Sequence, residues 1–170
     1  MKKLLLICIP LAVVLLAASA DATFAQDTPK AEVFAGYSYM HDDVPGGNQN
    51  LNGFEVSGTG NINRWLGIEG AVAGLFGDGH DHALVMGGPK LSYRNGRIVP
   101  YVHALFGVDG SLGYGDDNAF TMALGGGVDA KLNDHVSIRI VQVDYQPLFY
   151  DQVAQNVRVS TGVVFTFGKK

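Results

Sequence analysis

Most of this chain alternates large apolar residues with small or polar ones at a period of two. Successive side chains of a β-strand point to opposite sides, so this period predicts strands whose two faces meet different surroundings. Eight segments show the alternation, and turn-forming or polar residues separate them. They cover residues 31–40, 53–62, 65–76, 83–93, 98–108, 120–132, 136–145 and 156–167. The chain is therefore predicted to be all-β.

The connections between these segments alternate in length. Connections of roughly 7 to 12 residues alternate with tight turns, among them Asn95-Gly96, which is a strong hairpin signal. This rhythm predicts an up-and-down meander with all long loops at one end. Eight such strands can close on themselves and so remove the exposed edges of an open sheet. The predicted fold is an eight-stranded antiparallel up-and-down β-barrel.

The alternation slips once, in the seventh segment. Arg139 has odd parity there, whereas Gln142 and Asp144 have even parity. One extra residue near Ile140 or Val141 would bring all three polar side chains to the same face, which is what a β-bulge does. The sequence therefore predicts a bulge in this segment.

Alternation alone fits both a soluble barrel with an apolar lumen and a membrane barrel with an apolar exterior. The charged face is otherwise mostly Gly, Ala, Ser and Thr, which suit the narrow interior of an eight-stranded barrel. The apolar face carries aromatic residues near both strand ends, as two interfacial girdles require. They are Tyr39, Phe54, Phe76, Phe106 and Phe120 toward the long loops, and Tyr93, Phe165 and Phe167 toward the short turns. The transmembrane β-barrel is favoured, and a soluble ligand-binding barrel is the alternative.

Residues 1–25 have the features of a secretory signal peptide. Two lysines precede an uncharged run of 15 residues, and small residues follow it. The run is shorter than the 18 or more residues that argue for a membrane-spanning helix. Cleavage is expected after Ala20 or Ala25, which leaves 26–170 as the barrel domain. It would remove Cys8, the only cysteine, so neither a disulfide nor a cysteine metal site is expected.

Four stretches of the chain resemble a known family, the small bacterial outer-membrane β-barrel proteins that belong with the barrel half of the OmpA group. The stretches are NGFEVSGTGNINRWLGIEG (52–70), YVHALFGV (101–108), ALGGGVDAKLNDHVSIRIVQVDY (123–145) and VRVSTGVVFTF (157–167). The resemblance covers about residues 32–167 and describes strands, so it implies a fold more than an activity. It implies a location in the bacterial outer membrane after export with a cleaved signal peptide.

The resemblance also implies partners, namely outer-membrane lipid and the outer-membrane assembly machinery. A hallmark of the family is a final strand ending in an aromatic residue that this machinery reads. Phe167 matches that position, although Gly168, Lys169 and Lys170 extend past it. OmpA itself adds a periplasmic peptidoglycan-binding domain, and we expect no such tether here.

The charged residues of the strands gather on the face predicted to line the lumen. They are Glu32, Glu55, Glu69, Lys90, His103, Asp129, Lys131, Arg139 and Arg158, joined by Asp144 if the bulge is present. In a narrow lumen such charges must pair, so a network of salt bridges that plugs the barrel is predicted. Two pairs are expected, Glu32 with Arg158 across the closing seam and Asp129 with Arg139 across a hairpin. The alternative is a gated ion path in which pairs exchange partners.

The long connections carry acids and no Lys or Arg. The acids are Asp42, Asp43, Asp78, Asp81, Asp109, Asp116, Asp117 and Asp151. Carboxylates are hard oxygen ligands, so this rim could hold divalent cations, although acidic loops also serve plain solubility. His80 and His82 are weak candidates for a transition-metal site. No cofactor is expected, and no metal site is assigned beyond these weak candidates.

Composition and motifs narrow the function. The net charge is -4 and no basic block is present, which argues against nucleic acid as a partner. Ser137 lies beside His135, but at a short turn with no evident substrate, so no enzymatic activity is expected. The predicted function is a monomeric structural or surface-interaction barrel. A narrow channel or carrier for ions or small apolar molecules is the alternative.

Overall fold

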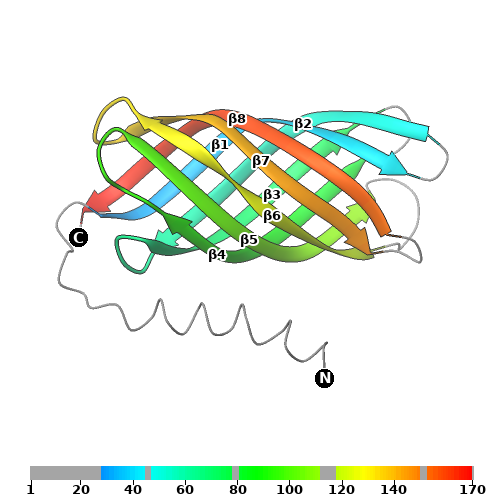
Figure 1. Ribbon diagram of the computed structural model, residues 1–170, viewed down its shortest axis with the longest axis horizontal. Coiled ribbons are helices and arrows are strands. Elements are labelled where there is room, and N and C mark those ends of the chain that lie inside the picture. Colours follow the sequence, from blue (N-terminus) through cyan, green and yellow to red (C-terminus); the bar gives the residue numbers. More distant parts are fainter. Residues whose placement is uncertain (1–27, 45–46, 78–80, 112–117, 150–152, 170) are drawn as a thin grey trace, which may run out of the picture.

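The computed structural model describes residues 28–44, 47–77, 81–111, 118–149 and 153–169. Eight strands follow one another along the chain, and each is antiparallel to the next (Figure 1). β8 pairs with β1, so the sheet closes into a barrel and the predicted fold is confirmed. The strands are β1 (Pro29–Val44), β2 (Gly47–Asn61), β3 (Leu66–Phe76), β4 (His82–Ser92), β5 (Ile98–Ser111), β6 (Asn118–Lys131), β7 (Val136–Phe149) and β8 (Val153–Lys169).

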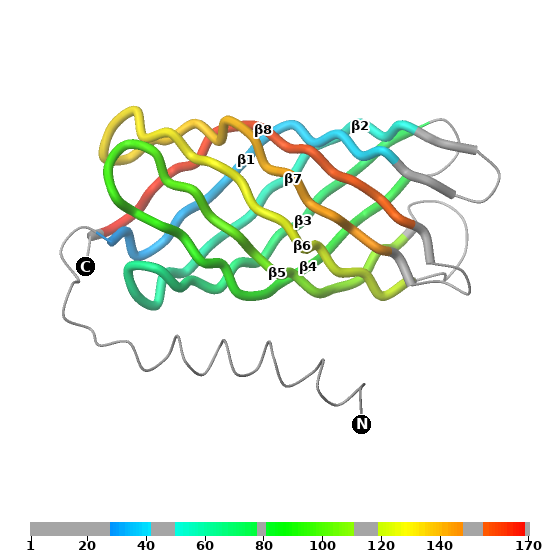
Figure 2. Tube along the Cα trace, in the orientation of Figure 1, coloured from blue at the N-terminus to red at the C-terminus, as the bar shows by residue number. Residues whose placement is uncertain are grey.

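The barrel has two distinct ends. The β2–β3, β4–β5 and β6–β7 turns gather at the end where β8 finishes, and β1, β3, β5 and β7 finish at the opposite end (Figures 1 and 2). We name these the turn end and the loop end. Asn63 shapes the first turn, because its Oδ1 accepts hydrogen bonds from the backbone N–H of Trp65 and Leu66 at 2.9 and 2.8 Å. Gly96 has a φ of 98°, which confirms the Asn-Gly hairpin signal.

The strands are longer than the alternation predicted, mostly toward the loop end. The first connection was expected to be a long loop, yet β1 and β2 stay paired as far as Val44 and Gly47. β7 likewise runs to Phe149, and β8 begins at Val153. These extensions contain polar and glycine residues and lack a clear period of two. The sequence pattern therefore cannot distinguish the extensions from loops.

The predicted bulge in β7 is confirmed. On the side of β6, Val128 pairs with Val141 whereas Asp129 pairs with Arg139, so Ile140 is the extra residue. The register shifts at the same point on the side of β8. Ile140 and Val141 are both exposed on the outer face, at 53% and 37%. The polar residues on either side of them therefore both face inward.

The exterior of the barrel is apolar, and its interior holds most of the buried charges. Seven of the eight predicted girdle aromatics are exposed on the outer face, at 43% to 65%, whereas Tyr39 is half-buried. The exposed seven are Phe54, Phe76, Tyr93, Phe106, Phe120, Phe165 and Phe167. In the part of the chain that the structure describes, no helix has the length and apolar character to cross a membrane.

Close strand approach on β2 gives a first prediction. An added Cβ at Gly53 would clash with the carbonyl oxygen of Gly74 on β3, whereas one at Gly58 would have nothing within 4 Å. Gly53→Ala should therefore lower the unfolding free energy by about 1–3 kcal/mol, as overpacking does, and Gly58→Ala should not. Urea titration of the two folded variants, followed by tryptophan fluorescence, measures the difference. Equal stabilities would contradict this strand geometry.

Candidate functional site

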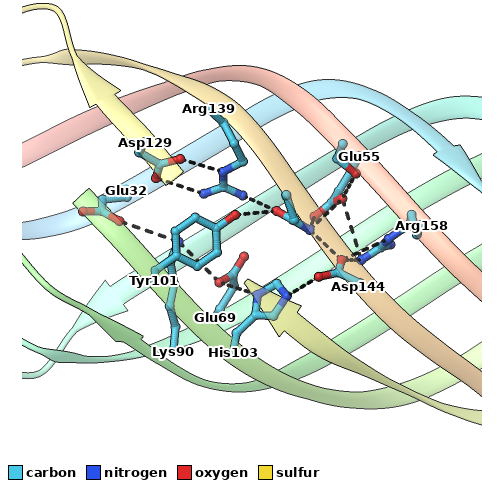
Figure 3. Close-up of polar contacts among 12 residues, drawn as sticks. Glu32, Glu55, Glu69, Lys90, Tyr101, His103, Asp129, Arg139, Asp144 and Arg158 are labelled. Atoms are coloured by element: carbon cyan, nitrogen blue, oxygen red, sulfur yellow. Dashed lines mark hydrogen bonds and ion pairs between the residues drawn. The ribbon is translucent and has the colours of Figure 1, made fainter. Parts of the chain in front are cut away.

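The predicted lumen charges do lie on the inner face of the barrel, and they come from all eight strands (Figure 3). Eight of the ten residues are buried, and the Glu32 side chain is 12% exposed. Lys131 is half-buried and lines a hollow at the turn end. The eight buried residues are Glu55, Glu69, Lys90, His103, Asp129, Arg139, Asp144 and Arg158.

Arg139 is held on several sides. Its Nε and Nη2 donate to the two carboxylate oxygens of Asp129 at 2.9 and 3.3 Å, so this predicted pair is present. Its guanidinium carbon lies 4.1 Å from the ring centroid of Phe34 and 4.5 Å from that of Tyr101. Such a sandwich adds cation–π attraction to a bidentate ion pair. Phe34 is apolar but faces inward, where it is buried and makes this contact.

Gln142 joins the part of the network around Arg139 to the part around Asp144 and Glu55. It was not among the predicted lumen residues. Its Oε1 accepts hydrogen bonds from Arg139 Nη1 at 2.6 Å and from the Tyr101 hydroxyl at 2.8 Å. Its Nε2 donates to Asp144 at 2.7 Å and to Glu55 at 3.2 Å. The amide thus places an acceptor toward the donors and a donor toward the carboxylates. The slip in the alternation does predict that Gln142 shares a face with Arg139 and Asp144.

Arg158 anchors the half of the network between β7, β8 and β2. Its Nη2 lies 2.7 Å from Asp144 and 3.7 Å from Glu55. Ser160 completes this group by donating to Glu55 at 2.8 Å. The predicted Glu32–Arg158 pair is wrong, because along the closing seam Arg158 lies opposite Met40.

Glu32 instead pairs at the turn end. Its Oε1 accepts from Arg94 Nη2 at 2.9 Å, and its Oε2 lies 3.9 Å from Lys90 Nζ. The Lys90 ammonium is also 3.4 Å from Glu69 and 4.3 Å from the ring centroid of Tyr101. Arg94 belongs to the β4–β5 turn and was not among the predicted lumen residues, yet its side chain is buried. A turn residue can reach inward because an arginine side chain is long.

His103 lies between two carboxylates. Its Nε2 is 2.8 Å from Asp144 and its Nδ1 is 3.4 Å from Glu69. A neutral imidazole has only one N–H, so donation to both acids requires the imidazolium form. A charged His103 also balances the network, because it joins four other cations against five carboxylates.

A buried apolar cluster lies beyond the charges, toward the loop end. On each of β1 to β5 its members are nearer the loop end than the residue that the same strand contributes to the charged network. The cluster consists of Met40, Leu51, Ala71, Ala73, Leu75, Leu84, Met86, Leu105 and Ala123. Its larger members have the inward parity of their strands. The large apolar residues with inward parity could therefore have predicted this cluster from the sequence.

The loop end also holds buried polar side chains with no bonded partner. Gln146 and Asn156 face each other across β7 and β8, both fully buried. Neither amide has a hydrogen-bond partner among the described residues. Unpaired buried amides are costly, so this corner of the lumen is less well satisfied than the charged network.

A hollow of about 580 Å³ opens at the turn end and leads toward the network. Glu32 and Asp129 lie at its wall, with Lys131 and Arg94 beside them. Ser137 and His135 also line it, but no hydrogen bond joins them, so the geometry of an activated nucleophile is missing there.

Most of the predicted acidic rim and part of the predicted metal site lie outside the described side chains. Those positions are Asp42, Asp43, Asp78, His80, Asp116, Asp117 and Asp151. Asp109 was predicted to lie in a loop, but it is fully buried within β5 and accepts from the His82 ring at 2.8 Å. Within the described ranges, no group of three or more metal-ligating side chains is found.

Comparison with known proteins identifies the fold. No protein-family model and no curated protein matches the chain. Among solved structures, neisserial surface protein A superposes with a TM-score of 0.62 at 15% identity, covering 81% of this chain and 97% of that one. Ail, the attachment invasion locus protein of Yersinia pestis, gives 0.57 at 18%, covering 82% and 99%. OprG, an outer-membrane protein of Pseudomonas aeruginosa, gives 0.59 at 11%, covering 84% and 98%.

These likenesses show a shared fold, that of small outer-membrane β-barrels. The resemblance predicted from the strands is thereby confirmed at the level of the fold. Each comparison covers nearly the whole of the other barrel, so the described strands correspond to a complete barrel of this kind.

The bridging amide of Gln142 gives a second prediction. Gln142→Glu keeps the size of the side chain. It replaces the Nε2 donor that faces Glu55 and Asp144 with an oxygen atom of a third carboxylate. Breaking a buried ionic network in this way should cost about 3–5 kcal/mol of unfolding free energy. Gln155→Glu, at an exposed position of β8, is the matched control and should change stability little. Chemical denaturation of both variants tests the difference, and a stable Gln142→Glu barrel would refute the bridging role.

A double-mutant cycle tests the pairing itself. Asp129→Asn and Arg139→Gln should each destabilise the barrel strongly, whereas the double variant should lose much less than the two losses added. Glu32→Gln and Arg158→Gln share no bonded partner, so their effects should add. Unfolding free energies of the six variants provide both couplings, and additivity within the Asp129–Arg139 cycle would rule out that pair.

Proposed function

We propose that this protein is a structural or surface-interaction barrel of the bacterial outer membrane, with a plugged lumen and no chemistry of its own. The observation that carries the proposal is the fill of the lumen by two stacked layers. The charged network crosses the lumen between strands that are not adjacent in the sheet, and the apolar cluster follows it toward the loop end. Eight strands enclose too little space for an aqueous channel beside such side chains.

The apolar exterior supports the membrane location. Strands of 11 to 17 residues equal or exceed the 9–11 that a tilted strand needs to cross a bilayer. We place the turn end in the periplasm and the acidic connections outside, after export with a cleaved signal peptide. Outer-membrane lipid would surround a monomer, and divalent cations would bind at the acidic loops.

A narrow ion path is the second candidate, and one contact favours it. Lys90 Nζ lies 3.4 Å from Glu69 and 3.9 Å from Glu32, so a small movement would exchange its partner. The turn-end hollow reaches the Glu32 side of this pair. Conduction would also require ions to pass through the apolar cluster. A plugged barrel requires no such passage.

Electrical recording separates the two candidates. Wild-type protein reconstituted in planar bilayers should give no discrete openings. Regular openings that Lys90→Met abolishes, with Lys131→Met in the hollow as the control, would overturn the plugged barrel. A shift in gel migration between unheated and boiled samples establishes that each reconstituted variant is folded.

Assembly provides a further prediction. Phe167 is 54% exposed near the end of β8, and we propose that the assembly machinery reads it. Phe167→Ala should reduce the amount of folded barrel in outer-membrane fractions by several-fold. Phe106→Ala, an exposed aromatic of the other girdle, is the control and should have a smaller effect. Equal yields for the two variants would contradict a special role of Phe167.

A further inference from the structure

The turn end carries a cluster of cations that the lumen network does not use. Lys30 and Arg97 are exposed, and Arg64 is half-buried. We name these three residues the basic arc. The carboxylates of Glu32 and Asp129 at this end are bonded to Arg94 and Arg139, which are not part of the arc. Asp134 of the β6–β7 turn is also exposed at this end, but the three cations outnumber it, so the surface of this end is basic on balance.

Backbone and side-chain contacts make the arc continuous. Arg64 donates to the carbonyl of Arg94 at 3.0 Å, and Arg94 donates back to the carbonyl of Arg64 at 2.7 Å, which ties the first two turns together. The Arg97 carbonyl accepts from the N–H of Lys131 at 2.8 Å. On the other side, Asn61 bonds the carbonyl of Pro29, the neighbour of Lys30, at 3.0 Å.

Amphipathic aromatic side chains border the arc on its outer side. Trp65 follows Arg64 directly and is 57% exposed, and Tyr93 is 65% exposed. The backbone joins these neighbours as well, because the N–H of Ser92 donates to the Trp65 carbonyl at 2.7 Å. Such rings settle at the level of lipid headgroups, which sets the depth of the adjacent cations.

The opposite end has the reverse chemistry. Residues 41–52, 77–82, 109–119 and 150–156 contain acids and no Lys or Arg. A barrel with one basic rim and one acidic rim meets an anionic headgroup favourably on one side only. Each Lys or Arg near such a surface contributes attraction of roughly 1 kcal/mol, which is about five-fold in affinity.

We propose that the basic arc binds the phosphate groups of anionic phospholipids in the leaflet at the turn end. Arg64 and Arg97 supply guanidinium donors suited to phosphate oxygens, and Lys30 adds a point charge. Trp65 and Tyr93 contact the upper acyl chain region beside the headgroup. This inference rests on the proposed membrane location.

Native mass spectrometry of the full barrel tests the proposal. The protein is released from bilayers that contain equal amounts of phosphatidylglycerol and phosphatidylethanolamine. It should retain phosphatidylglycerol in at least five-fold excess over phosphatidylethanolamine. Lys30→Gln with Arg97→Gln should reduce this preference by about five-fold or more. Neither side chain forms a hydrogen bond or ion pair in the described structure, so the variant is expected to fold. Arg97→Gln alone, with an intermediate loss, is the second variant.

Charge-preserving substitutions are the control. Lys30→Arg with Arg97→Lys should keep most of the preference, and added salt should weaken it in the wild type. Equal retention of both lipids by a folded, inserted wild-type barrel would overturn this inference alone. Failure to insert into any bilayer would overturn the membrane location as well.

Discussion

A lumen enclosed by eight strands has little room for water, so each charge that points inward must find its partner within the chain. The network meets this constraint by drawing on every strand, from Glu32 on β1 to Arg158 on β8. A slip of one residue in any strand would move its charge to the outer face, where a bilayer penalises it. The register of the sheet and the bonding of the lumen therefore fix each other.

The bulge at Ile140 shows how closely the two are linked. β7 must supply a cation to Asp129 on β6 and, toward the loop end, groups that bond Glu55 and Arg158. A regular strand with this spacing would turn either Arg139 or the pair Gln142 and Asp144 outward. The extra residue removes that conflict while keeping two apolar side chains on the exterior.

The sequence was sufficient to predict what depends on parity and short hairpins. The eight strands, the bulge and the Asp129–Arg139 pair each follow from spacing along one or two neighbouring segments. The Glu32–Arg158 pair failed because adjacent strands need not place their charges at the same height. Glu32 lies opposite Thr166 on β8, and Arg158 lies opposite Met40 on β1. The stagger of the closing seam is a property of the whole barrel, which no local pattern contains.

Two other features escaped prediction for different reasons. The bonding of Gln142 to both halves of the network depends on which side chains reach the centre of the lumen, and that requires all the registers together. The apolar cluster was visible in principle, because Leu75 shares the parity of Glu69, and Leu105 that of His103. It was missed because an outward apolar face was assumed to imply an inward polar face along the whole strand.

The two layers of the lumen have different consequences for folding. Buried ion pairs add little stability over a well-packed apolar fill, so stability alone does not explain a charged layer. A lumen filled only with leucine would make the inner and outer faces chemically alike, and a slip of one residue would cost little. Charges in the middle of the strands remove that ambiguity, because Arg or Lys at the bilayer midplane costs about 2–4 kcal/mol. The charged layer determines which face of each strand points into the lumen. Apolar residues such as Leu51 and Leu84 can then fill the loop end while the strand register stays fixed.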